Sequence, residues 1–246
     1  MSRFFLPGLP EQGTVQLDGP EAHHLAHVLR LTAGQVVELF NGQGRSATAL
    51  ISHVHKKAVQ LELQSVRQCV RSGPQLTLAV AVPKGDRFDW LVEKAVELGV
   101  ARLVPLITSR SVVDPRDSKL DRLRQTVVAA CKQSRQDFLM DLAAPLSWRD
   151  YVAQISANER HWIAHPGGPP LRAMLADGGA GAITVAIGPE GGFSDDEVAA
   201  AVAAGAAPVA LGELILRVET AALAVAALIR LGTVQSGQPS DVSRAG

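Results

Sequence analysis

The stretch Ile187-Gly188-Pro189-Glu190-Gly191-Gly192-Phe193-Ser194-Asp195-Asp196-Glu197 joins an apolar run to an amphipathic segment. The apolar run Ile183–Ile187 is expected to form a buried strand, and Asp195–Ala204 is expected to form a helix. Ser194 and Glu197 have the Ser-x-x-Glu spacing of a capping box, which marks the first turn of a helix. A buried strand, a short loop and a helix in this order predict an α/β fold with a parallel sheet.

The glycine-rich part of this stretch is a candidate binding loop. Its three glycines let a backbone approach a ligand closely, and ligands of open parallel sheets bind outside the carboxyl ends of the strands. A tight strand–helix turn without any ligand is the alternative interpretation. No Gly-Lys-Ser/Thr follows the loop, and no Gly-x-Gly-x-x-Gly occurs in the chain. A phosphate loop and the usual dinucleotide fingerprint are therefore excluded.

A second loop, within Leu211–Ala222, has an unusual composition. Residues 214–216 read Leu-Ile-Leu, which is very apolar for a loop, so we expect them to line a pocket or fold into the core. Arg217 and Glu219 flank them, and these two charges could simply pair with each other. Thr220 is the predicted N-cap of the last helix.

Working outward, the chain divides near the polar segment 67–74, which ends in Gly-Pro. We predict a domain over residues 1–72, a second over 73–234, and a disordered Ser/Gly/Pro-rich tail over 235–246. The first domain shows short strands around one helix, typical of a small antiparallel barrel: strands Val36–Phe40, Ala47–His53 and Ala58–Leu63, and helix Glu21–Leu29. The second alternates strands with helices: strands Leu76–Val82, Leu103–Ile107, His161–Ala164, Ile183–Ile187 and Pro208–Leu211, and helices Asp86–Leu98, Ser118–Gln133, Asp195–Ala204 and Thr220–Leu231. Gly99 is expected to end the first of these helices.

Composition narrows the class of protein. The 246 residues carry 24 Lys/Arg and 24 Asp/Glu, so a strongly basic DNA-coating protein is excluded, although a local basic patch is not. Two cysteines make neither a disulfide framework nor a four-ligand zinc site, and His23, His24 and His27 lack further ligands nearby, so we predict no metal. No apolar run reaches the length of about 20 residues that a membrane helix needs. We therefore expect a soluble cytoplasmic protein.

Two motifs resemble one known family. Gly-Pro-Glu-Gly-Gly-Phe-Ser at 188–194 and Leu-Gly-x-x-Ile-Leu-Arg-x-Glu-Thr-Ala at 211–221 are similar to the signature of the RsmE-type 16S rRNA (uracil-N3) methyltransferases, which are SPOUT-class enzymes. Val28-Leu29-Arg30-Leu31 and Lys84-Gly85-Asp86-Arg87 also resemble that family, and the similarity runs over about 3–231. One stretch departs from it: in Lys132-Gln133-Ser134-Arg135 the arginine comes one place early.

The resemblance implies features that periodicity alone does not. It implies a PUA-like antiparallel β-barrel followed by an α/β SPOUT domain with a C-terminal trefoil knot, in a homodimer. It implies S-adenosyl-L-methionine (SAM) as the cofactor and 16S rRNA of the small ribosomal subunit as the partner. It implies no membrane partner. By the same resemblance, the candidate cofactor residues are His165, Ile187, Gly188, Pro189, Gly191, Gly192, Leu211, Ile215, Leu216 and Thr220.

Methyl transfer to N3 of a uridine sets chemical requirements. The imide N–H is about as weakly acidic as a tyrosine hydroxyl, so it must lose its proton and its two carbonyl oxygens need support. Arg217 is the first candidate for that support, because a guanidinium stays charged and can reach a carbonyl oxygen. Glu219 or Glu190 could orient Arg217 or take the proton. The candidate contacts to RNA phosphates are Arg30, Lys84, Arg87, Arg110 and Arg135.

Two other functions stay open at this point. A non-catalytic RNA-binding assembly factor on the same fold would keep the barrel, but here both cofactor loops are intact. An α/β enzyme that binds another adenosine ligand is disfavoured by the missing phosphate-binding motifs. Two structural features are also expected: Lys94 pairs with Glu97 on one helix, and Cys131 is a buried, inert thiol.

Overall fold

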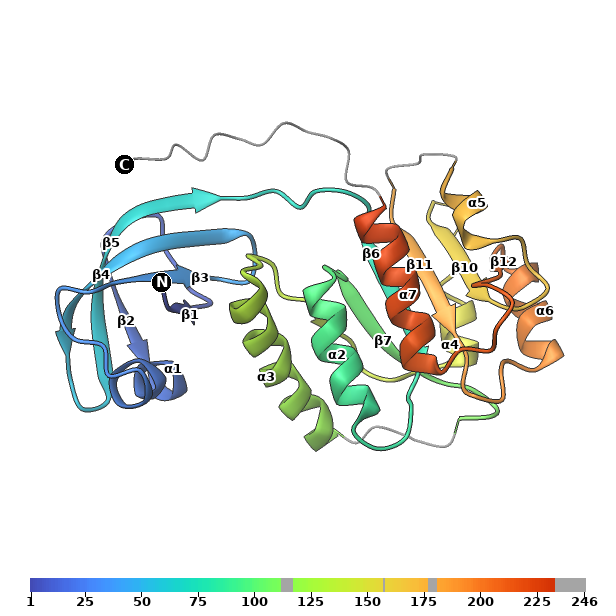
Figure 1. The fold of residues 1–246 in the computed structure, drawn as a ribbon, viewed down its shortest axis with the longest axis horizontal. Helices are drawn as coiled ribbons and strands as arrows, with labels where there is room; N and C mark the ends of the chain where they lie inside the picture. The colour runs from blue at the N-terminus through green and yellow to red at the C-terminus, as the bar shows by residue number, and fades with distance from the viewer. Residues whose placement is uncertain (112–116, 157, 177–180, 233–246) are drawn as a thin grey trace. The chain divides into compact units, whose positions relative to one another are not determined.

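The structure is a computed structural model that describes residues 1–111, 117–156, 158–176 and 181–232 (Figure 1). The tail predicted over 235–246 lies outside the described residues, as do residues 233–234. The chain forms two compact units. The N-terminal unit contains Met1–Ser72 together with Arg122–Met140, and the C-terminal unit contains Gly73–Asp121 and Asp141–Gly246. Each unit is therefore made of two separate segments of the chain.

The N-terminal unit is built on a five-stranded sheet in the order β1-β3-β4-β5-β2, which is curled in Figure 1. Its strands are β1 (Arg3–Phe5), β2 (Thr14–Asp18), β3 (Val36–Phe40), β4 (Arg45–Val54) and β5 (Ala58–Gln68). The pairs β3–β4, β4–β5 and β2–β5 are antiparallel, but β1 pairs with β3 in parallel. The antiparallel pairing expected for the strands that correspond to β3, β4 and β5 is confirmed, and β1, for which no strand was expected, joins the edge of the sheet in parallel.

Alternation along these strands explains the core. Ile51 and Leu61 point inward and are fully buried, while their sequence neighbours are more exposed. In β3, by contrast, Leu39 and its neighbours Glu38 and Phe40 are all buried. The helix predicted over Glu21–Leu29 is instead two short pieces, α1 (Gly19–His23) and a π-helical turn, η1 (His24–Val28). Leu25 from this turn closes the core of the sheet.

The second part of the N-terminal unit comes from α3 (Asp117–Ser134), whose residues from Arg122 onward belong to it, and from the segment that follows. Gly42 and Gly44 in the β3–β4 turn have positive φ, and side chains at these positions would collide with Leu139 and Phe138. The Gly44 N–H donates to the Asp137 carbonyl at 2.8 Å. The glycines are therefore needed for the close approach of residues 137–139.

A buried charge cluster also holds this segment. Arg3 and Glu38 are each 6% exposed, and Arg3 pairs with Asp137 and, at 3.8 Å, with Glu38. Arg67 Nη2 and Arg135 Nη1 reach Glu38 at 3.1 and 3.9 Å. Because a buried carboxylate without a partner is costly, this network fixes residues 135–137 against the sheet.

The C-terminal unit contains a parallel sheet in the order β12-β10-β11-β6-β7-β8, with β9 also paired to β7. Every pairing in it is parallel. Its strands are β6 (Leu76–Ala81), β7 (Arg102–Ile107), β8 (Asp141–Leu142), β9 (Leu146–Ser147), β10 (Arg160–Ala164), β11 (Ile183–Ile187) and β12 (Ala207–Val209). The predicted parallel sheet is confirmed, and the two-residue strands β8 and β9 are additions too short for periodicity to show.

Helices cover both faces of this sheet (Figure 1). They are α2 (Arg87–Glu97), α4 (Trp148–Val152), α5 (Leu171–Leu175), α6 (Asp195–Ala203) and α7 (Val218–Leu231). On one face α2 packs against α7, which contacts β6 and β11. On the other, Trp148 of α4 and Ala201 of α6 share a core with Ala79 and Ala186 of the central strands. This double cover explains why the strands read as continuous apolar runs.

Three local predictions are confirmed. Lys94 pairs with Glu97 at 2.8 Å. The Cys131 side chain is buried, and burial raises the pKa of its thiol to about 11. Gly99 follows the C-cap of α2 with a φ of 73°, a conformation that ends helices.

Candidate active site

Three loops meet at the carboxyl ends of neighbouring strands of the C-terminal unit. Residues 165–168 follow β10, residues 188–194 follow β11, and residues 211–217 follow β12 and lead into α7. Strands β10, β11 and β12 are adjacent in the sheet, so the two motifs that lie about 20 residues apart in sequence become neighbours in space. This is the edge at which open parallel sheets bind their ligands.

The loops enclose a pocket with about 770 Å³ of empty space, part of it open to solvent. The pocket is lined by Ala164, His165, Pro166, Ile187, Gly188, Pro189, Glu190, Gly192, Leu211, Gly212, Glu213, Leu214, Ile215, Leu216, Val218 and Ala221. Its described lining includes carboxylates of Glu190 and Glu213 but no lysine or arginine. A ligand with cationic and apolar parts suits such a lining better than a phosphate does.

The glycine-rich loop is held in a tight form. A side chain at Gly188 would lie 3.0 Å from the Phe193 ring, which itself packs at a tilt against Trp148 with ring centroids 4.5 Å apart. The Gly192 N–H donates to the Pro189 carbonyl at 2.8 Å, and Gly192 has a φ of 68°. A Cβ at Gly192 would meet no protein atom within 4 Å. The backbone there is bare, which allows a ligand to come close.

Glu197 connects this loop to the loop after β7. The predicted capping box is confirmed: Ser194 N–H donates to Glu197 Oε2 at 2.8 Å, and Glu197 N–H donates to Ser194 Oγ at 3.2 Å. Glu197 Oε1 also accepts the Ser109 N–H at 2.8 Å. Burial by itself acts to raise the pKa of Glu197, but the donors from Ser109 and Ser194 outweigh it, so the pKa lies below its ordinary value. Sequence spacing revealed the contact with Ser194 but not the one with Ser109.

The apolar loop 214–216 lines the pocket as expected, but it is not folded into the core. Leu214 is 81% exposed and Ile215 is 94% exposed. Gly212, which precedes them, has a φ of 129°, a conformation that side chains rarely tolerate. Two large aliphatic side chains this exposed indicate a surface that another molecule covers.

The charged residues next to the pocket pair differently from the prediction. Arg87, a candidate RNA contact, lies 3.2 Å from Glu190 and 3.6 Å from Glu219. The suggested structural pair of Arg217 with Glu219 does not form. The Glu219 side chain is only 9% exposed, and its second oxygen, Oε2, is buried without a hydrogen-bond partner among the described residues. Arg87 was not expected here because its sequence position gives no sign of which loops it faces.

Arg217 occupies the N-cap position of α7, which corrects the prediction of Thr220 as the N-cap. The helix begins earlier, at Val218, because residues 218–219 already turn into helical conformation and bury their side chains. The Arg217 carbonyl accepts the Ala221 N–H at 2.8 Å, whereas its exposed side chain makes no hydrogen bond or ion pair with any described residue. Thr220 and Gly191 do not line the pocket, and neither does Glu219.

The other candidate RNA contacts are distributed over both units. Arg110 donates from Nη1 to the carbonyl oxygens of Gly191 and Phe193, so it is bound to the glycine-rich loop. Lys84 is exposed, and its carbonyl oxygen accepts from Arg87 Nε at 3.2 Å. Arg30 and Arg135 belong to the N-terminal unit, and both have positive φ, 53° and 58°.

Metal-binding clusters and membrane-spanning helices are both absent from the described residues. Within this part of the chain, no group of three or more His, Cys, Asp or Glu side chains is placed to hold a metal ion. Over the same residues, no helix combines the length and the apolar character needed to cross a bilayer.

Comparison with known proteins identifies the class. Residues 71–230 match the family described as "RNA methyltransferase domain", and residues 17–64 match "RNA methyltransferase PUA domain". The fold and the pocket thus define an RNA methyltransferase of the SPOUT class with a PUA-like N-terminal part.

Individual relatives identify the family within this class. The chain is 35% identical over 219 residues to Ribosomal RNA small subunit methyltransferase E of Synechocystis, covering 86% of this chain and 72% of that one. The structure of the same enzyme from Neisseria gonorrhoeae bound to S-adenosyl methionine superimposes with a TM-score of 0.85 at 31% identity, covering 94% and 98% of the two chains. A Legionella pneumophila methyltransferase with bound SAM gives 0.84, also at 31% identity, covering 94% and 97%. The chain belongs to the ribosomal RNA small subunit methyltransferase E family.

Proposed function

We propose that this protein transfers a methyl group from SAM to N3 of one uridine in 16S rRNA of the small ribosomal subunit, in the cytoplasm. The observation that carries the proposal is the pocket at the carboxyl ends of β10–β12. It is formed by the loops that carry the family motifs, and related structures are described with SAM bound.

The pocket fits SAM chemically. SAM has an adenine ring, a sulfonium cation and an amino acid end, and it lacks phosphates. The aliphatic side chains of Leu214, Ile215 and Leu216 can cover an aromatic ring, and the carboxylates of Glu190 and Glu213 favour a cation. The backbone near Ile187, Gly188 and Leu211, with His165 and Pro189 beside it, offers N–H and C=O groups for the adenine and ribose. Gly191, Gly192 and Thr220 support the two loops.

When bound, SAM supplies an electrophilic methyl group on sulfur. Arg217 extends from the N-cap of α7 next to the pocket, exposed and unpaired among the described residues, and a guanidinium there can stabilise the negative charge that develops on a uracil carbonyl oxygen. Glu219 and Glu190 are the candidate acceptors for the N3 proton. Arg87 contacts both carboxylates, so it limits where they point.

The proposal also covers the two domains, the oligomeric state and the contacts to RNA. Residues 1–72 form a PUA-like RNA-binding domain, and residues 73–234 form a SPOUT domain whose C-terminal segment is threaded as a trefoil knot. Two copies of the chain associate. Helices α2 and α7 pack together, and both expose large apolar side chains: Trp90 on α2, and Leu228 and Leu231 on α7. This exposed apolar surface supports an interface with another copy. Candidate phosphate contacts of the RNA are Arg30, Lys84, Arg87, Arg110 and Arg135.

The test is transfer of labelled methyl groups to small subunits from cells that lack the protein, followed by nucleoside analysis. Labelled 3-methyluridine at one site is the expected product. Arg217→Ala should lower kcat by about 10²–10³-fold, the usual effect of removing one donor to a developing oxyanion. The control is Glu213→Gln, which removes a pocket carboxylate that does not pair with Arg87. This variant should alter mainly the KM for SAM.

Other outcomes would redirect the proposal. Binding of SAM, seen as a rise in melting temperature, together with no methyl transfer would mean that the substrate is wrong. Neither binding nor transfer would favour the RNA-binding assembly factor.

A further inference from the structure

The two units differ strongly in charge. Residues 1–72 and 122–140 contain eleven Lys/Arg and six Asp/Glu, a formal charge of +5, so the remainder of this neutral chain carries −5. The segment 122–140 contributes four of the basic residues, which is why the difference is larger than the sequence boundary alone suggests. A basic unit on an otherwise acidic chain is the electrostatic sign of a polyanion-binding surface.

Most of the carboxylates in this unit are already used internally. Glu11 pairs with Arg45 at 2.9 Å and Glu21 pairs with Lys132 at 2.9 Å. Glu38 and Asp137 lie in the buried cluster with Arg3. By contrast, three exposed cations make no ion pair with any described carboxylate: Arg30, Lys56 and Lys57.

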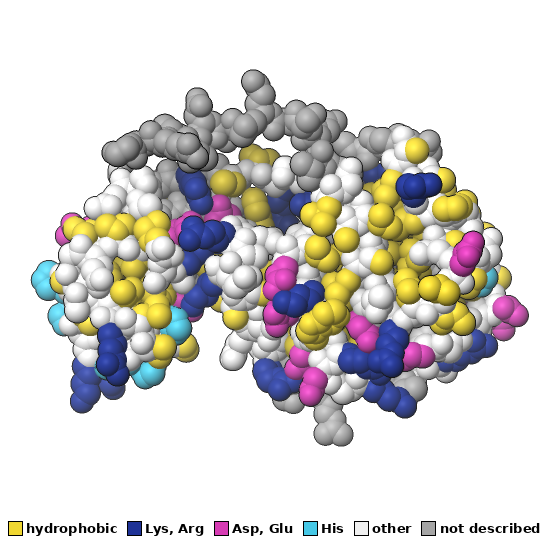
Figure 2. Space-filling model, in the orientation of Figure 1, with side chains coloured by type: hydrophobic (Ala, Val, Ile, Leu, Met, Phe, Trp, Pro, Cys, Tyr) yellow, Lys and Arg dark blue, Asp and Glu magenta, His cyan; other side chains and the backbone are white. Residues whose placement is uncertain are grey.

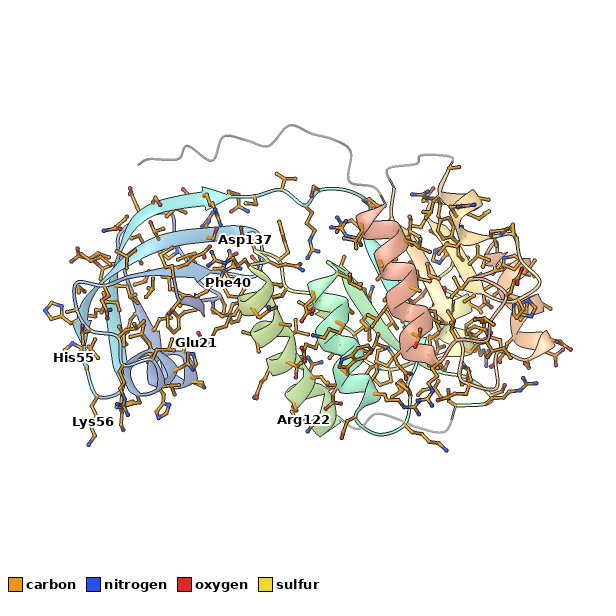
Figure 3. The ribbon with its side chains drawn as sticks, in the orientation of Figure 1. Glu21, Phe40, His55, Lys56, Arg122 and Asp137 are labelled. Atoms are coloured by element: carbon orange, nitrogen blue, oxygen red, sulfur yellow. The ribbon has the colours of Figure 1, made fainter. Side chains whose placement is uncertain are left out.

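These three cations lie at the same end of the curled sheet. Lys56 and Lys57 form the turn between β4 and β5. Asp18, where α1 begins, pairs with Ala58 directly after that turn. The connection through α1, η1 and Arg30 returns to β4, where Gly34 N–H donates to the Ile51 carbonyl at 2.8 Å. Both ends of this connection are therefore anchored beside the turn, and Figure 3 shows His55 and Lys56 at the end of the unit where α1 lies.

Histidines gather at this end as well. His53 and His55 lie just before the turn with nearly parallel rings, 6.1 Å between centroids and 9° between planes. His23 and His27 form a second pair at 4.9 Å. All four are exposed, and Figure 2 shows imidazoles beside basic side chains over this part of the unit. We define the barrel-end face as Arg30, Lys56 and Lys57 with His23, His27, His53 and His55.

We propose that the barrel-end face binds the phosphate backbone and unpaired bases of RNA. The unpaired cations match phosphates, whereas exposed flat rings are the side chains on which splayed-out RNA bases stack. This combination favours RNA over an acidic protein, which offers no bases. The inference rests on the proposed action on rRNA and deepens it by naming a contact surface in addition to Arg30.

The test measures binding alone, in the absence of SAM, to a 16S rRNA transcript and to assembled small subunits. Lys56→Gln/Lys57→Gln should weaken binding about tenfold to thirtyfold at 0.1 M salt and reduce the slope of log affinity against log salt by about 1.4, near 0.7 for each phosphate that is no longer neutralised. Arg30→Gln, from the neighbouring connection, should weaken binding further. The matched control is Arg149→Gln/Arg172→Gln, which removes two exposed charges from the C-terminal unit and should change neither quantity.

A second pair of variants tests the stacking role. His53→Ala/His55→Ala should weaken binding to RNA but not to heparin, a polyanion without bases. Unchanged RNA affinity in the lysine variant overturns the proposal. So does weaker binding that appears with assembled subunits but not with naked rRNA, because the partner would then be a ribosomal protein. Since binding is measured without methyl transfer, failure of the enzymatic proposal would appear separately in the wild-type activity.

Discussion

Glu197→Gln tests whether one buried carboxylate holds the glycine-rich loop in place. Glu197 is 8% exposed, and its two oxygens accept N–H groups from Ser109 and Ser194, each at 2.8 Å. Glutamine keeps one acceptor and places an NH₂ group against the other N–H. The variant therefore keeps the size of the side chain and removes one charge-assisted hydrogen bond together with the charge.

The expected loss of stability follows from these hydrogen bonds. A hydrogen bond to a charged group contributes about 1.5–3 kcal/mol. The negative charge in the first turn of α6 adds about 0.3–1 kcal/mol through the helix dipole. We expect the variant to lose about 2–4 kcal/mol of unfolding free energy at neutral pH, mostly from the hydrogen bond.

The pKa shift of Glu197 sets how the stability difference between wild type and variant changes with pH. Because the folded-state pKa of Glu197 lies below its ordinary value of 4.5, the carboxylate stabilises the fold fully above that value. The stabilisation disappears as the pH falls through the folded-state pKa. The difference between wild type and Glu197→Gln should therefore be largest at pH 7 and shrink in acid.

Urea unfolding followed by tryptophan fluorescence measures this difference. Trp90, Trp148 and Trp162 all belong to the C-terminal unit, so the signal reports that unit alone. Asp196→Asn is the control, since Asp196 lies exposed in the same turn and should cost only about 0.3–1 kcal/mol. A Glu197→Gln variant no less stable than the control, or one whose deficit is independent of pH, would refute the reasoning.

Three further predictions use the same geometry. Gly188→Ala places a Cβ 3.0 Å from the Phe193 ring and should weaken SAM binding in calorimetry about tenfold, or about 1.4 kcal/mol, whereas Gly181→Ala, which has open space, should not. Arg110→Gln frees the Gly191 and Phe193 carbonyls and should raise the Kd for SAM; weaker RNA binding with an unchanged Kd for SAM would assign Arg110 to RNA alone. Gly44→Ala drives a Cβ into Phe138 and should destabilise the N-terminal unit by about 2–4 kcal/mol in scanning calorimetry, against about 1 kcal/mol for Gly13→Ala, which has positive φ but no collision.

Local patterns predicted those features whose causes are local. The capping box of Ser194 and Glu197, the end of α2 at Gly99 and the pair Lys94–Glu97 each depend on residues a few positions apart, and all three are confirmed. The parallel sheet followed from continuous apolar strands, because burial on both faces removes the polar alternation. The start of α7 was wrong by two residues, because burial of Val218 and Glu219 outweighs the capping preference of Thr220.

Contacts between distant segments could not be found in this way. Arg87 meets Glu190 and Glu219 across more than 100 residues, and nothing in the sequence near Arg87 differs from an ordinary exposed arginine. The same holds for Ser109, whose backbone N–H completes the Glu197 site. The sequence motifs identified the pocket loops, whereas the residues that hold those loops came only from the structure.

Net charge illustrates the same limit for function. A formal charge of zero excludes a protein that is basic overall, but it arises here from a unit of +5 and a remainder of −5. The opposite signs suit opposite ligands: polyanionic RNA for the N-terminal unit, and a sulfonium cation beside Glu190 and Glu213 in the pocket. Because phosphates are attracted by one unit and disfavoured by the pocket lining of the other, RNA and SAM do not compete for the same charges. The barrel-end variants should accordingly change RNA affinity and leave SAM affinity intact.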